Sequence, residues 1–223
     1  MSRYYKLFLS IAVLVISAAT SSVRADTIQI VGVSTGQAST ATVVCEFNSQ
    51  TNTFTFTITN TSSITQPGST STITGIGYDL PPTGNASASG LNGFTGMQAP
   101  SLSSNFTFSD GDLGNVPDGF NSTVLDFGFI TGSNFTGGDP NSGLQPGESA
   151  SFIISGAAFT GFTEEQICNA IYVRFQAVPA PGGGQTSDVG VPTTSEVPEP
   201  SAILLFGSAL LGLGGIARKR FKN

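Results

Sequence analysis

The chain has 223 residues, with 8 Lys and Arg, 14 Asp and Glu, and no His, so its formal net charge is −6. Residues 26–199 hold all fourteen acidic residues but only one basic residue, Arg174, and therefore carry a net charge of −13. Nucleic acids and anionic lipids bind through cations that neutralise phosphate, so both are excluded as partners of this stretch. The absence of His also excludes a nucleophilic enzyme of the Cys–His type.

Residues 1–25 have the three parts of a secretory signal peptide. Arg3 and Lys6 give a positive start, residues 7–19 form an apolar run that is short for a membrane span, and Ala25 is a small residue at the end. We therefore predict cleavage before Asp26 and export of the rest of the chain.

Residues 26–178 are long enough for one domain with a sizeable core. The clearest pattern is in residues 52–60, where Phe54, Phe56 and Ile58 alternate with threonines, as in a half-buried strand. Further runs of this kind occupy residues 27–33, 41–47, 71–78, 105–109, 124–131, 150–155 and 170–178. This pattern predicts an all-β fold, a single antiparallel β-sandwich of about eight strands. A capping-box sequence, Thr163 to Gln166, predicts one short helix.

Residues 179–196 are dominated by Pro, Gly, Ser and Thr. This composition is typical of a linker, and we expect it to hold the domain away from a membrane.

Residues 197–223 consist of three successive parts. Pro198, Glu199 and Pro200 form an acidic proline motif. The uncharged run 201–217 follows, and as a transmembrane helix it would span about 25 Å, the short end of what crosses a bilayer. The basic tail 218–222, with Arg218, Lys219 and Arg220, is expected to stay cytoplasmic and to fix the orientation of the helix.

The order and position of these three parts resemble the PEP-CTERM sorting signal of Gram-negative bacteria. The resemblance implies that a membrane-embedded exosortase recognises Pro198, Glu199 and Pro200 and processes a precursor anchored in the inner membrane. It further implies that the protein is delivered to the cell surface or extracellular matrix. Proteins with this signal are often associated with exopolysaccharide and biofilm matrix. We therefore expect a structural or adhesive role in an exopolysaccharide layer. The resemblance covers 27 of 223 residues and says little about the domain before it.

Cys45 and Cys168 are the only two cysteines. Disulfides persist in exported proteins, so we predict a bridge between them. It would close a loop of more than 120 residues, which the chain-entropy account values at about 4–5 kcal/mol.

Asp110 and Asp112 flank a glycine in a loop after a predicted strand. Alternating carboxylates of this kind gather oxygen ligands around Ca²⁺, although the spacing and terminal Glu of an EF-hand are missing. The alternative is a solvated turn. Calcium is the only cofactor that the sequence suggests.

Two other classes of function remain as alternatives. A glycan-binding module would use aromatic rings, for which Tyr78 and Tyr172 are candidates, whereas Phe at alternating positions indicates core. A secreted hydrolase would need two neighbouring carboxylates. The candidates are Glu46, Asp79, Asp126 and Glu148, and nothing in the sequence places any two of them together. We therefore expect that the protein is not an enzyme.

Overall fold

The computed structural model describes residues 25–63, 69–81, 91–99, 105–111, 113–114, 116–117, 119–120, 123–180 and 182–193. The predicted signal peptide, except Ala25, and the whole of residues 197–223 lie outside this range. The predicted transmembrane helix 201–217 belongs to the part that is not described. Within the described part, no helix has the length and apolar character needed to cross a bilayer.

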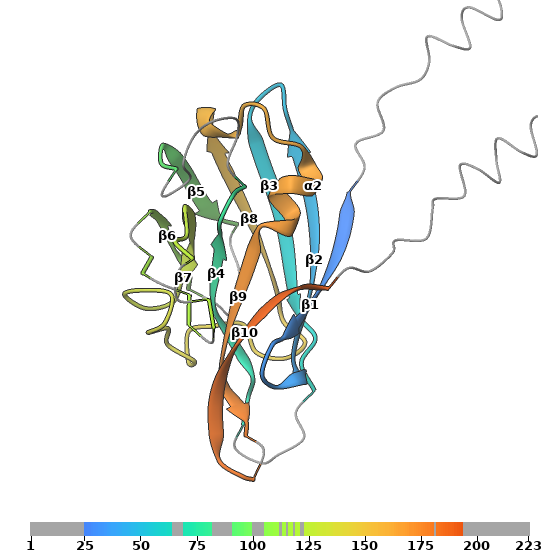
Figure 1. The fold of residues 1–223 in the computed structure, drawn as a ribbon, viewed down its shortest axis with the longest axis vertical. Coiled ribbons are helices and arrows are strands. Elements are labelled where there is room, and N and C mark those ends of the chain that lie inside the picture. Colours follow the sequence, from blue (N-terminus) through green and yellow to red (C-terminus); the bar gives the residue numbers. More distant parts are fainter. Residues whose placement is uncertain are drawn as a thin grey trace, which may run out of the picture. The chain divides into compact units, whose positions relative to one another are not determined.

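The described residues form one antiparallel sheet of ten strands (Figure 1). Along the chain the strands are β1 (Asp26–Gly32), β2 (Gly36–Asn48), β3 (Thr53–Asn60), β4 (Thr72–Tyr78), β5 (Phe94–Gln98), β6 (Thr107–Asp110), β7 (Phe127–Ile130), β8 (Ser149–Gly156), β9 (Ile171–Pro179) and β10 (Gln185–Thr193). Across the sheet their order is β5-β8-β3-β2-β1-β10-β9-β4-β7-β6. A 3₁₀ turn, η1 (Ala157–Phe159), and a short helix, α2 (Glu164–Asn169), lie between β8 and β9.

The two edge strands of this sheet, β5 and β6, lie against each other. The carboxylate of Asp110, at the end of β6, accepts hydrogen bonds from the backbone N–H groups of Gly93, at 2.9 Å, and Phe94, at 3.2 Å. The side-chain oxygen of Gln98 on β5 accepts from the N–H of Phe106 at 2.9 Å. Side chains therefore join the edges, and the sheet is nearly closed.

The all-β, antiparallel prediction is confirmed, but the sandwich of about eight strands is corrected to one sheet of ten. Each of the eight predicted runs overlaps a strand, and the sequence pattern missed β5 and β10. A sandwich consists of two sheets that share no strand pairing. Here β10 pairs with β1 on one side and with β9 on the other, so it joins the two halves into one continuous sheet.

The prediction that residues 179–196 form a linker is wrong for Gln185–Thr193, which is β10. The small residues of this segment allow neighbouring core side chains to pack closely against the backbone of β10. A Cβ on Gly190 would come within 2.6 Å of Ile30 and 2.8 Å of the Phe175 ring. The neighbouring Asp188 is fully buried, and its carboxylate accepts from the N–H groups of Ser34, at 3.0 Å, and Thr35, at 2.7 Å, in the turn between β1 and β2.

Aromatic rings from opposite walls of the curled sheet fill its interior. Phe152 on β8 has its ring centroid 5.0 Å from that of Phe56 on β3 and 4.4 Å from that of Phe129 on β7. Tyr78 on β4 stacks on Phe127 with centroids 5.0 Å apart. These side chains are all buried, so the alternating Phe residues are core, as the sequence indicated.

The opposite side of β3 and β8 carries hydroxyl groups. Thr57 and Ser151 face each other across the two strands with their oxygens 2.7 Å apart, and Thr59 and Ser149 do the same at 2.7 Å. We call this outward surface the hydroxyl face and define it by Thr53, Thr55, Thr57, Thr59, Ser149, Ser151 and Ser155.

Candidate functional site

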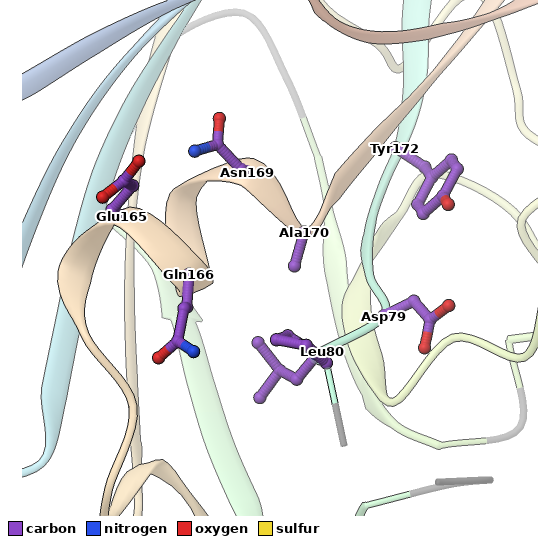
Figure 2. A pocket seen from close by; sticks show the side chains of 8 residues that line it. Asp79, Leu80, Glu165, Gln166, Asn169, Ala170 and Tyr172 are labelled. Carbon is purple, nitrogen blue, oxygen red and sulfur yellow. The ribbon is translucent and has the colours of Figure 1, made fainter. Parts of the chain in front are cut away.

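A depression of about 730 Å³ opens between α2 and the segment that follows β4 (Figure 2). We call it the α2 pocket. Its wall on the helix side consists of Glu165, Gln166 and Asn169, and the opposite wall comes from the end of β4 and the start of β9. The lining residues are Asp79, Leu80, Pro81, Glu165, Gln166, Asn169, Ala170 and Tyr172.

The helix that forms one wall begins with the predicted capping box. The hydroxyl of Thr163 accepts from the backbone N–H of Gln166 at 3.2 Å, and the Gln166 side chain accepts from the backbone N–H of Thr163 at 2.9 Å. Glu164 accepts from the N–H of Phe47 on β2 at 2.6 Å. These bonds satisfy N–H groups at the helix start and hold α2 beside the sheet (Figure 1).

The structure contains the predicted disulfide between Cys45 and Cys168. Cys45 lies on β2 and Cys168 in the last turn of α2, with Cα atoms 6.2 Å apart, and both side chains are buried. The bridge therefore ties the wall of the α2 pocket covalently to the middle of the sheet.

The buried carboxylate of Asp126, a residue that is 3% exposed, holds the backbone of the opposite wall in place. Its carboxylate accepts from the backbone N–H of Leu80 at 2.8 Å and from that of Leu91 at 2.6 Å. The N–H of Asp79 donates to the carbonyl of Ala170 at 3.0 Å, which joins this wall to the residue after α2. Backbone contacts thus fix where the Asp79 side chain enters the pocket.

Asp79 and Asp126 influence each other electrostatically. Burial raises the pKa of Asp79, and repulsion from the Asp126 carboxylate raises it further. Burial also raises the pKa of Asp126, while hydrogen bonds from the N–H groups of Leu80 and Leu91 act in the opposite direction. Asp126 uses one oxygen for each of these bonds, so it supports the wall and Asp79 is the carboxyl that lines the pocket.

The four carboxylates considered for a hydrolase are thus placed differently. Asp79 and Asp126 are brought together. Glu46 is exposed on β2, and Glu148 accepts from the N–H of Gln145 at 2.8 Å in the turn before β8. Neither Glu46 nor Glu148 lines the α2 pocket.

The two candidate tyrosines also have different positions. Tyr78 is fully buried in the aromatic core, so its ring is not available to a ligand. Tyr172 lines the pocket next to Asp79, across from Glu165 and Gln166 (Figure 2). The Phe120 ring packs edge-on against Tyr172 with centroids 5.4 Å apart and supports it from the side.

The predicted calcium ligands are partly described. Asp110 closes the seam between β5 and β6, and Asp112 lies outside the described residues. No group of three or more His, Cys, Asp or Glu residues within the described ranges is placed to hold a metal ion. A calcium site that includes Asp112 stays a prediction.

Sequence reasoning missed Glu165, Gln166 and Asn169 as pocket residues. The capping box predicted the helix that carries them, but it gave no sign that this helix faces Asp79, 86 positions earlier in the chain.

The chain therefore combines an all-β domain, which contains the α2 pocket, with a C-terminal sorting signal. That signal is the PEP-CTERM protein-sorting motif, whose family model matches residues 196–220. The matched range includes the proline motif, the apolar run and Arg218, Lys219 and Arg220. It implies a membrane-anchored precursor that an exosortase processes and that is then exported to the cell surface. No curated protein and no solved structure matches the chain.

Proposed function

We propose that this protein is a structural or adhesive component of an extracellular polysaccharide layer and does not catalyse a reaction. The observation that carries the proposal is the sorting motif at residues 196–220, because its delivery route ends at the surface. Pro198, Glu199 and Pro200 serve as the recognition motif, the predicted helix 201–217 as a transient anchor, and the basic cluster as the orientation signal.

The described domain supports this role in two ways. A buried disulfide and a core of stacked rings suit a protein that must persist outside the cell. The hydroxyl face can exchange hydrogen bonds with the hydroxyl groups of a hydrated polysaccharide.

Sorting is tested by replacing Pro198, Glu199 and Pro200 together with alanine. We expect the variant to accumulate as precursor in the inner membrane, whereas the wild-type protein recovered from the surface has an intact mass that ends near residues 197–201. A matched control replaces Thr194 and Ser195, just before the matched range, and should be sorted normally. Normal release of the triple variant, or a surface form that retains residues 221–223, would contradict the proposal.

The structural role is tested on the extracellular layer itself. We expect the protein to remain with the polysaccharide fraction through high-salt washing and to be released when a glycoside hydrolase degrades the polymer. Release by salt alone would indicate mere charge attraction, and the structural role would then be wrong.

A further inference from the structure

We propose that the α2 pocket binds a non-acidic saccharide. This inference rests on the proposed function and deepens it, since it names a site and a class of ligand within the polysaccharide layer. The volume of the α2 pocket, about 730 Å³, lies within the range of about 300–1,000 Å³ that is usual for pockets that hold small organic molecules.

The chemistry of the lining fits a sugar ring. The carboxylates of Asp79 and Glu165 accept hydrogen bonds from sugar hydroxyls, and the side-chain amide of Asn169 both donates and accepts them. Gln166 offers its amide N–H groups as donors, because its oxygen is used in the capping box. The Tyr172 ring and the apolar Leu80 and Pro81 offer surface to the C–H face of a pyranose. Polar groups lie on both walls, so a bound ring would be held from two sides (Figure 2).

The pocket is formed before any ligand arrives. The disulfide and the capping box fix the helical wall, and Asp126 fixes the backbone of Leu80 on the other side. Phe120 restrains the Tyr172 ring. Walls whose backbone is already fixed lose little backbone entropy on binding, which matters for a ligand that gains its affinity from a few hydrogen bonds.

Charge selects among saccharides. Among the described residues that line the pocket there are two acids and no cation, and residues 26–199 carry a net charge of −13. A uronic acid would bring a third carboxylate next to Asp79 and Glu165 and would be repelled. A neutral hexose meets no such penalty, and an amino sugar would gain attraction from its ammonium group.

The test is a calorimetric titration of the full-length chain, purified in detergent with its disulfide intact. The probes are three tetrasaccharides: a neutral β-glucan, a glucosamine oligomer and a galacturonate oligomer. We expect binding of the neutral or the glucosamine probe and none of the galacturonate. Asp79→Asn should weaken the affinity about tenfold or more, which is the effect of losing a hydrogen bond to a charged group. Asn169→Ala removes a neutral, exposed amide and should weaken the affinity by about two- to tenfold.

The matched control is Glu46→Gln, which removes an exposed carboxylate on β2 outside the pocket and should leave the affinity unchanged. Failure of both non-acidic probes to bind the wild type, or equal affinity in the pocket variants, would overturn the inference. Surface delivery of the same variants is measured in parallel. Normal delivery without binding refutes the saccharide site alone, whereas binding without release from the inner membrane refutes the proposed function alone.

Discussion

The ring of Tyr78 packs in the core, but within the described part of the chain its hydroxyl group makes no favourable contact. The side chain is fully buried between Phe54, Phe56 and Phe127, and its hydroxyl has no hydrogen-bond partner among the described residues. Burial also raises its pKa well above the ordinary value of 10.0, so it stays neutral. The hydroxyl therefore loses its hydration on folding and gains nothing in return.

We predict that Tyr78→Phe leaves the free energy of unfolding unchanged or raises it by about 1 kcal/mol. The measurement is urea denaturation followed by far-UV circular dichroism. Tyr172→Phe is the control, because that side chain is only partly buried and should change stability little. A loss of more than about 1 kcal/mol in Tyr78→Phe would mean that the hydroxyl has a partner after all.

The carboxyls of Asp79 and Asp126 make stability depend on pH. Burial raises both pKa values above the ordinary 3.8, and Asp126 raises that of Asp79 further. The folded protein therefore holds these protons more tightly than the unfolded chain does. Their contribution to stability is fully present below pH 3.8, and it is lost as the pH rises through the folded-state pKa values.

We therefore predict that the melting temperature rises as the pH is lowered from 7 toward about 4. Asp79→Asn should raise the melting temperature at pH 7 and flatten this dependence, since it removes both a partly buried charge and a repulsion. Asp139→Asn is the control, because that carboxyl is only partly buried and hydrogen bonds from Asn141 and Ser142 lower its pKa instead of raising it. An unchanged pH dependence in Asp79→Asn would show that the pair does not control stability.

At the scale of elements, the stability of helix α2 comes from its contacts with the sheet more than from its own hydrogen bonds. It has only six residues, too few for a helix to be stable alone. Its attachments are the Cys45–Cys168 bridge and the contact between Glu164 and the N–H of Phe47. The bridge spans 123 positions, so it also restricts the unfolded chain strongly.

We predict that the double variant Cys45→Ala/Cys168→Ala loses about 4–5 kcal/mol of stability by the chain-entropy account. Chemical denaturation of the oxidised protein and the variant measures this loss. Thr163→Ala, which removes only the cap, should cost about 1 kcal/mol and separates the effect of the helix from that of the bridge. A loss in the double variant no larger than in Thr163→Ala would show that the bridge contributes little.

Several elements could be predicted because a local pattern encodes them. Phe54, Phe56 and Ile58 alternate because one face of β3 meets the core, and the Thr163 cap lies within four residues of its partner. β5 gave no such pattern, since Phe94 is its only buried side chain. Its Gly96 packs beneath the ring of Phe108 on β6, a long-range contact that leaves no local signature.

The candidate site was less predictable than the fold for the same reason. Asp79 and Tyr172 stood out as residue types, but only pairing of β4 with β9 brings Tyr172 opposite Gly77, two positions before Asp79. The role of Asp110 was also hidden. It lies in a sequence typical of calcium ligands, yet it holds the seam between two edge strands that are distant in pairing order.

At the scale of the whole molecule, β10 decides whether the sheet is continuous. Its Gly, Ser and Pro content is that of a linker, but Asp188 and Val189 are fully buried, and Gly190 meets Ile30 and Phe175 closely. Removing β10 would leave β1 and β9 as unpaired edges and would uncover the core in the middle of the sheet. The folding unit therefore has to extend to Thr193.

We predict that a chain truncated after Thr193 unfolds in one cooperative thermal transition, whereas truncation after Val178 abolishes that transition. The physical reason is that the shorter chain loses the strand between the two halves of the sheet, together with the Asp188 carboxylate that holds the turn from Ser34 to Thr35. Point variants separate these losses: Gly190→Val should be severely destabilised by overlap with Ile30, whereas Gly183→Ala, in the turn with nothing within 4 Å of its added Cβ, should fold with only the cost of its positive φ. If the chain ending at Val178 melts like the longer one, β10 is dispensable, and the domain would instead be stable as two sheets packed face to face.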